Sequence, residues 1–169
     1  RLIDSFVNDD LSNWYVRLNR KRFWGKEMSN DKLAAYSSLY TCLITVSKLL
    51  APFAPFYADE LYHDLGGKLK SVHLERFPAV DESLVDIDLE ERMSMAQKIT
   101  SMVLALRRKV NVKVRQPLQQ IMIPAVDNEQ KAHIEAVKSL IMNEVNVKEL
   151  KFAEGQGMLV KKVKCNFRV

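Results

Sequence analysis

Apolar residues recur at helical spacing along the first 24 residues, and this pattern constrains the fold more than any other feature. Five of them lie three or four positions apart: Ile3, Val7, Leu11, Trp14 and Leu18. An α-helix advances by about 100° per residue, so this spacing brings them onto one face. The pattern therefore predicts an amphipathic helix over about Ile3–Trp24, which ends where Gly25 can adopt a left-handed conformation.

The next segments continue the helical character. A second helix is expected over about Asp31–Leu50, after residues 29–31, whose side chains can cap a helix N-terminus. Pro52 and Pro55 then interrupt the pattern, because proline has no amide hydrogen to donate. Pro55 is suited to the first turn of a third helix, which is expected to end at Gly66–Gly67.

A long connection and a fourth helix follow. The segment Lys68–Asp88 is rich in acids, contains a proline, and is expected to wrap around the surface. Asp86 or Asp88 can cap a helix that ends near Val110. Four amphipathic helices in sequence predict a helical bundle over residues 1–112.

The hydrophobic period changes after Val110, where β-branched residues alternate with polar ones. Residues 113–169 are therefore predicted to form a small α+β appendage to a mainly α fold. The expected elements are a strand at Leu118–Ala125, a helix from Asp127 or Asn128 to about Asn143, and strands at Val145–Phe152 and Met158–Val169.

Positive charge is concentrated in two segments. The net charge of +5 and the pI of about 9.2 favour an anionic partner. The segment Asn13–Lys26 contains five basic residues and four aromatic ones, and no acid. On a helix, one flank of it would carry Asn13, Arg17, Arg20 and Trp24. Such a flank suits unpaired nucleic acid, because guanidinium groups pair with phosphate and an indole can stack on a base. The alternative is a bundle helix with a solvated basic side and a buried tryptophan.

The second basic segment is Arg107–Arg115, and it is followed by Gln116-Pro117. Lys109, Lys113 and Arg115 are candidate phosphate contacts, and Gln116 is a candidate hydrogen-bonding partner for a base edge. The alternative is a basic helix end that complements the helix dipole, followed by a loop. The two basic segments could lie on one surface.

The sequence shows no pattern typical of a catalytic or metal site. The three histidines have no cysteine or carboxylate at metal-ligand spacing, and neither a phosphate-binding loop nor a nucleophile elbow is present. Two distant cysteines predict free thiols in a reducing cytosol. No continuous apolar run reaches the ~20 residues of a membrane span, so no membrane association is expected. The opening Arg1 suggests a fragment of a longer chain.

Four blocks in order resemble the anticodon-binding domain of isoleucyl-tRNA synthetases. They are Phe6-Val7-Asn8-Asp9-Asp10-Leu11-Ser12-Asn13-Trp14-Tyr15-Val16-Arg17 with Arg22-Phe23-Trp24, then Leu50-Ala51-Pro52-Phe53-Ala54-Pro55-Phe56, Ser71-Val72-His73-Leu74, and Lys113-Val114-Arg115-Gln116-Pro117-Leu118. The resemblance covers most of Ile3–Leu118, and it is weaker from Gln119 onward.

The resemblance implies the helical bundle of a class I synthetase anticodon-binding domain and a partner, the anticodon stem-loop of isoleucine tRNA. In the family this domain helps to align the tRNA with the catalytic domain of the same parent chain, which uses ATP with magnesium. The family's HIGH and KMSKS signatures are absent from this sequence. We therefore expect no catalytic site, metal or cofactor in the fragment, and a cytoplasmic, monomeric module.

The resemblance also suggests roles for individual residues in binding RNA. Phosphate contacts are expected from Arg17, Arg20, Lys21, Arg22 and Lys113. Base stacking is expected from Trp24, with Tyr15 and Phe23 as further candidates, and base-edge hydrogen bonds from Asn13, Arg115 and Gln116. Two other interpretations remain open: a structural or protein-docking bundle with a solvated basic face, and an autonomous RNA chaperone.

Overall fold

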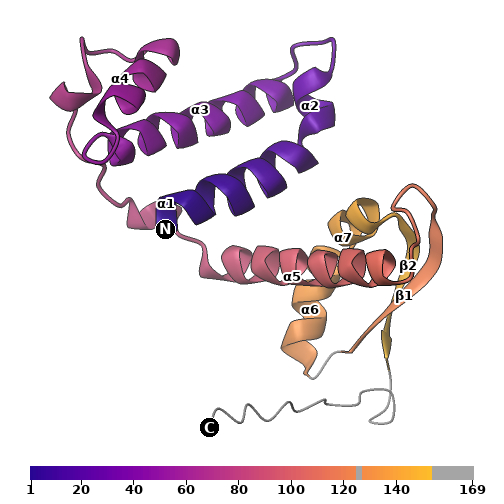
Figure 1. Ribbon diagram of the computed structural model, residues 1–169. Coiled ribbons are helices and arrows are strands. Elements are labelled where there is room, and N and C mark those ends of the chain that lie inside the picture. The colour runs from indigo at the N-terminus through magenta and orange to yellow at the C-terminus, as the bar shows by residue number, and fades with distance from the viewer. Residues whose placement is uncertain (125–126, 154–169) are drawn as a thin grey trace, which may run out of the picture. The chain divides into compact units, whose positions relative to one another are not determined.

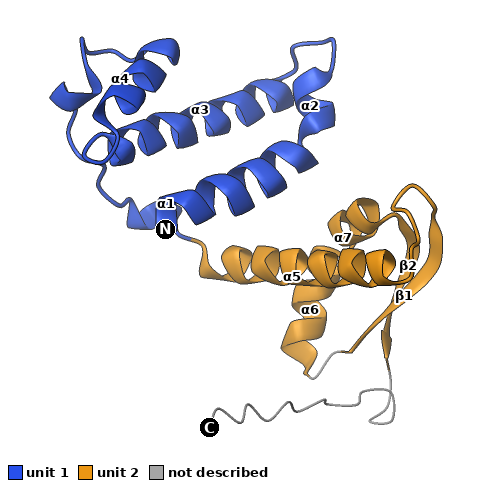
Figure 2. Cartoon of the chain, viewed as in Figure 1, with its two compact units in different colours: residues 1–85 blue, residues 86–169 orange. Residues whose placement is uncertain are grey.

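The computed structural model describes residues 1–124 and 127–153. The chain divides into two compact units, Arg1–Val85 and Asp86–Val169 (Figure 2). Helices make up most of the described residues (Figure 1), so the prediction of a mainly α fold with a small α+β part is confirmed.

The first unit consists of helices and helical turns. They are α1 (Leu2–Ser5), the π-helix η1 (Phe6–Val16), α2 (Arg20–Trp24), α3 (Asn30–Leu50), α4 (Pro55–Asp64) and the 3₁₀ turns η2 (Val72–Leu74) and η3 (Glu82–Leu84). The helix predicted over Ile3–Trp24 is therefore interrupted. Its backbone leaves helical geometry at Asn19 (φ −91°, ψ 9°), where the side-chain amide donates to the Tyr15 carbonyl oxygen at 2.8 Å. The Asn19 backbone amide bonds the same oxygen (3.1 Å), so this carbonyl group accepts from both nitrogens of Asn19. Side-chain bonds of this kind favour the end of a helix, and α2 turns away from η1 (Figure 1).

Local sequence signals set the other helix ends as predicted. The Ser29 hydroxyl caps α3 by accepting a hydrogen bond from the Lys32 amide (3.2 Å), and Pro55 is the first residue of α4. The chain reverses after α4 at Gly66, which has a φ of +74°. A Cβ atom at Gly67 would overlap the Tyr62 ring, so only glycine fits there.

The connection after α4 forms polar contacts with both α3 and α4. Glu75 accepts hydrogen bonds from the Tyr62 hydroxyl (2.6 Å) and the Lys48 ammonium group (3.1 Å). Both hydrogen bonds lower the pKa of Glu75 below its usual value, and the bond from the Tyr62 hydroxyl has the larger effect. The Asp59 carboxylate accepts from the Ser71 hydroxyl (2.7 Å) and from the next amide (2.8 Å). The family-like motif at residues 71–74 therefore has a structural role in this unit.

Helix α3 is the one helix in the described part of the chain that is long and apolar enough to cross a membrane. Core helices of soluble proteins also meet this criterion of length and composition. Hydroxyl groups along α3 bond back to its own carbonyl oxygens, as Ser38 does with Ala34 (3.0 Å) and Thr45 with Thr41 (2.8 Å). Such hydroxyl bonds also occur in membrane helices, so length and composition alone are weak evidence for a membrane span.

The second unit begins with one long helix and continues as a β-α-α-β arrangement. Its elements are α5 (Ile87–Lys109), β1 (Leu118–Pro124), α6 (Asn128–Ala136), α7 (Lys138–Val145) and β2 (Val147–Ala153). Asp86 caps α5 by accepting from the Leu89 amide (3.0 Å). The strands are parallel, with Leu118 opposite Val147, and parallel strands need a crossover connection, which α6 and α7 supply.

Two details of the second unit differ from the sequence analysis. The helix expected from Asp127 or Asn128 to Asn143 is split at Val137, whose amide bonds the Ile134 carbonyl oxygen only three residues back (3.2 Å). The strand expected at Met158–Val169 lies outside the described residues.

The boundary between the compact units also differs from the predicted one. The sequence analysis divided the chain into residues 1–112 and 113–169, whereas the structure divides it after Val85. Helix α5 packs against α6 and α7, and its Ala96, Ile99 and Thr100 are buried. The apolar face of α5 therefore contributes to the core of the second unit.

Candidate nucleic-acid interface

Helix α2 presents an exposed indole together with two cations. Trp24 has 79% of its surface exposed, and the Arg20 guanidinium carbon lies over its ring, 5.9 Å from the centroid. Lys21 is also exposed. We call Arg20, Lys21 and Trp24 the α2 surface. The cation–π contact holds a positive charge beside a ring on which a base can stack.

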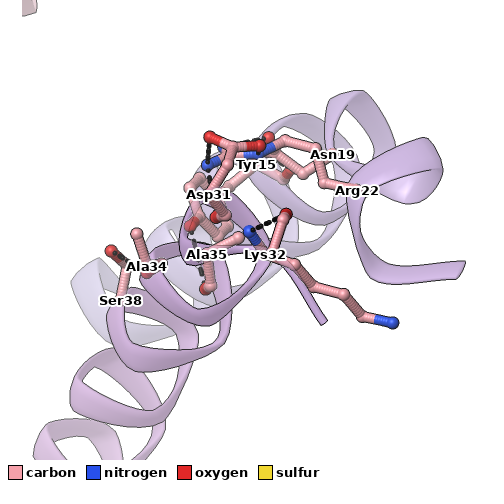
Figure 3. A network of polar contacts seen from close by, with 9 residues as sticks. Tyr15, Asn19, Arg22, Asp31, Lys32, Ala34, Ala35 and Ser38 are labelled. Carbon is pink, nitrogen blue, oxygen red and sulfur yellow. Dashed lines mark hydrogen bonds and ion pairs between the residues drawn. The ribbon is translucent and has the colours of Figure 1, made fainter. Parts of the chain in front are cut away.

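Arg22 follows Lys21 in α2, but its guanidinium forms hydrogen bonds within the protein. Its guanidinium donates two hydrogen bonds to the Asp31 carboxylate, at 2.7 and 2.6 Å, and one to the Asp31 carbonyl oxygen at 2.9 Å (Figure 3). A further bond of 2.7 Å reaches the Asn19 side chain. These bonds join α2 to the first turn of α3. The phosphate contact predicted for Arg22 therefore competes with a structural role.

The aromatic residues around α2 divide into buried and exposed groups. Phe23 is buried, with edge-to-face contacts to Tyr15 (centroids 6.3 Å apart) and Tyr36 (5.1 Å). The Tyr15 hydroxyl donates to the Ala35 carbonyl oxygen at 3.1 Å. In contrast to the stacking role suggested by the sequence, Phe23 has no exposed face for a base, and half-buried Tyr15 is held in the same cluster. Trp14 is buried, as its place on the apolar stripe predicted.

The four residues predicted to share one helix flank do not lie on a single continuous helix. Asn13 is exposed and Arg17 is half-buried, but the wider turns of η1 and the break at Asn19 separate them from α2. A π-helix has more residues per turn than an α-helix, so its side chains fall at different angles. Asn13 and Arg17 therefore do not continue the line of Arg20 and Trp24.

The second candidate region is the C-terminal end of α5 and the connection from it to β1. Its four predicted RNA-binding side chains are all exposed: Lys109, Lys113, Arg115 and Gln116. A tight turn forms within it, because the Gln116 amide bonds the Lys113 carbonyl oxygen at 3.0 Å. We call residues 113–116 the KVRQ loop. It offers two cations and one amide from a compact turn, a combination that suits phosphates and base edges.

Two residues outside the KVRQ loop donate hydrogen bonds to its carbonyl oxygens. Buried Arg107 donates to those of Lys113 (3.2 Å) and Gln116 (2.9 Å). The Asn146 side-chain amide donates to those of the two residues between them, at 2.9 and 3.2 Å. The sequence analysis assigned no role to either residue. Arg107 lies four positions after Val103 on the apolar stripe of α5. That helical spacing was the signal in the sequence that its side chain is buried.

The α2 surface belongs to the first unit and the KVRQ loop to the second. Both present cations and groups that can recognise bases. No cluster of three or more possible metal-binding side chains occurs within residues 1–124 and 127–153. The exposed side chains of the two regions are cations, an indole and an amide, which are groups that can bind anions and bases.

Comparison with known proteins gives a consistent assignment. Residues 1–123 match the family model described as the anticodon-binding domain of tRNA ligase. Over 99% of the chain, the sequence is 67% identical to an isoleucine–tRNA ligase of Bacteroides thetaiotaomicron and 61% identical to one of Porphyromonas gingivalis. A Thermoplasma volcanium isoleucine–tRNA ligase is 43% identical over 92% of the chain. The chain spans about 15% of the length of the curated relatives it matches. It belongs to the family of anticodon-binding domains of tRNA ligases.

Proposed function

We propose that this chain binds the anticodon stem-loop of isoleucine tRNA as part of an isoleucine–tRNA ligase. The observation that carries the proposal is the exposed Trp24 ring beside the guanidinium of Arg20, on a helix that also exposes Lys21. Single exposed aromatic residues are common on protein surfaces, so it is the cation beside the Trp24 ring that favours a nucleic-acid ligand here. Anticodon bases that leave the stack present the flat faces that such a ring accepts.

Each region offers its own contacts to RNA. The cations of the α2 surface in the first unit, and Lys109 and Lys113 in the second, are the candidates for phosphate contacts. Phosphate contacts position the RNA but carry no sequence information. Trp24 stacks on a base of the loop. Asn13, Arg115 and Gln116 are the candidates for hydrogen bonds to base edges, which distinguish one anticodon from another.

The proposed role of this binding in the parent ligase is alignment. Energy gathered at the anticodon orients the acceptor end of the tRNA at the catalytic domain of the same chain. ATP and magnesium act in that domain, because the family's ATP-site signatures do not occur in this sequence. We assign no step of isoleucine activation to the residues described above. The module is expected to act as a monomer in the cytoplasm.

One feature favours a second function, the docking of protein. Three phenylalanine side chains are strongly exposed: Phe53 (80%), Phe56 (91%) and Phe77 (67%). They suit contact with another protein surface, such as other parts of a parent ligase. A purely docking module would not discriminate between RNA hairpins.

A titration of the full chain with a labelled hairpin tests the proposal. The isoleucine anticodon stem-loop should bind more tightly than a hairpin with the same stem and altered anticodon bases. Its affinity should fall linearly with salt on a logarithmic plot, because neutralised phosphates release counterions. Trp24→Ala should weaken binding, whereas Phe56→Ala, which also removes an exposed aromatic ring, should not. Equal affinity for both hairpins, or equal effects of the two substitutions, would contradict the proposal.

A further inference from the structure

We propose that Arg107 is a positioning residue, which acts with Asn146 to hold the KVRQ loop in the shape that binds RNA. The inference rests on the proposed function and adds to it two residues that do not touch the RNA. The geometry that carries it is a set of side-chain hydrogen bonds, and these bonds reach the carbonyl oxygens of all four loop residues.

Arg107 is placed for this task by burial. Only 3% of its surface is exposed, whereas its neighbours Arg108 and Lys109 are exposed. A surface position at the end of α5 would complement the helix dipole equally well. Burial of a guanidinium is costly unless its donors are satisfied. The two terminal nitrogens of Arg107 make four hydrogen bonds, whereas its buried Nε has no partner among the described residues. The position of Arg107 is therefore best explained by the groups that it binds.

Those groups come from two segments that are distant in sequence. One terminal nitrogen of Arg107 bonds the carbonyl oxygens at both ends of the KVRQ loop, at 3.2 and 2.9 Å. The other bonds the carbonyl oxygens of Val145 (2.8 Å) and Asn146 (3.0 Å), where α7 ends. Carbonyl oxygens at a helix C-terminus lack partners within the helix. Arg107 thus ties the loop to the end of α7.

Asn146 completes the arrangement from the other side. Its backbone is left-handed (φ 51°, ψ 63°), a conformation that asparagine adopts more readily than most residues. This turn brings its side-chain amide to the two middle carbonyl oxygens of the loop. Its own carbonyl oxygen accepts from the Leu118 amide (3.1 Å), where β1 begins.

The consequence is a loop that is ordered before RNA arrives. While its carbonyl oxygens accept hydrogen bonds from Arg107 and Asn146, the KVRQ loop exposes the side chains of residues 113–116. Ordering a loop during binding reduces affinity, and a preformed loop avoids that cost. We therefore expect Arg107 to determine affinity through residues 113–116.

The test is Arg107→Lys in the full chain, measured with the isoleucine anticodon stem-loop. Lysine keeps the positive charge but lacks the two-pronged guanidinium. Affinity should fall about tenfold, because Lys113 and Arg115 would have to be ordered on binding. The slope of affinity against salt should not change, because no phosphate contact is removed. The matched control Arg108→Lys should bind as the unmodified chain does.

A double-mutant comparison separates positioning from general loss of stability. In a Lys113→Ala/Arg115→Ala background, Arg107→Lys should have little further effect, because the side chains that it positions are gone. Amide hydrogen exchange at Gln116 should accelerate in Arg107→Lys while exchange in α3 does not. Asn146→Gly keeps the left-handed turn and removes the amide, so it should weaken binding in the same direction and serves as a second variant if Arg107→Lys folds poorly.

The outcomes distinguish the inference from the proposed function. Unchanged affinity in Arg107→Lys and Asn146→Gly, or an equal loss in both backgrounds, overturns the positioning role while hairpin binding by the unmodified chain stands. An unmodified chain that ignores the hairpin overturns both.

Discussion

The guanidinium of Arg22 grips the carboxylate of Asp31 through two hydrogen bonds, of 2.7 and 2.6 Å (Figure 3). This paired geometry is the strong form of an arginine–carboxylate contact. It links α2 to the first turn of α3, where a negative charge is also favoured by the helix dipole. The orientation of α2, and with it the presentation of Trp24, therefore depends on a residue in the next helix.

Replacing Arg22 should affect stability, and replacing its neighbour Lys21 should affect RNA binding. Arg22→Ala is expected to lower the free energy of unfolding by about 1 kcal/mol, a modest value because Asp31 is largely exposed. Lys21→Ala should change stability by less than about 0.5 kcal/mol and reduce the salt slope of hairpin binding by about 1. Urea unfolding and salt-dependent titration measure the two effects. The reverse pattern would place Arg22 at the RNA.

Phe23 and Trp24 are adjacent aromatic residues with opposite surroundings, 8% and 79% exposed. Phe23→Ala should cost about 3–5 kcal/mol of stability, because it leaves a cavity between Tyr15 and Tyr36. Trp24→Ala should leave the unfolding free energy nearly unchanged and weaken hairpin binding by about 1–3 kcal/mol. A Trp24→Ala chain that binds the hairpin normally would exclude this ring from base stacking.

The stability of the first unit should fall in acid because of Glu75. Hydrogen bonds from the Tyr62 hydroxyl and, to a smaller extent, from Lys48 hold the pKa of Glu75 below its usual value in the folded state. A carboxyl with a lowered folded pKa contributes stability above its unfolded pKa, and this contribution is lost as the pH falls through the folded pKa. Glu75→Gln and Tyr62→Phe should both flatten the dependence of unfolding free energy on pH in this acidic range. Unfolding curves recorded from neutral pH into the acidic range would measure this dependence. If the unfolding free energy of both variants falls with pH as steeply as that of the unmodified chain, the role of Glu75 is contradicted.

Helix ends were predictable because their causes are local. Ser29, Pro55 and Asp86 act on backbone groups within three residues, so the sequence around each contains the whole signal. The interruption at Asn19 was not predicted, because it depends on a side-chain bond to Tyr15 in a segment without proline or glycine. The compact boundary after Val85 depends on which helices pack together, and helical spacing alone does not give that.

The candidate interface was predictable as a segment but not as a set of residues. Composition indicated that Asn13–Lys26 is basic and aromatic. It could not show that Arg22 has a partner nine residues later in α3 while Lys21 faces solvent. Arg107 shows the same limit in the second unit, since its partners lie up to 39 residues away. Tertiary contacts determine which cations are available to an anionic ligand.

Residue-by-residue NMR titration of the full chain with the isoleucine anticodon stem-loop tests the central claim most directly. The account predicts the largest shift changes at the Trp24 indole, at Arg20 and in the amides of residues 113–116, with little change at buried Phe23. Changes confined to Phe53, Phe56 and Phe77, with the Trp24 indole unaffected at saturation, would contradict it.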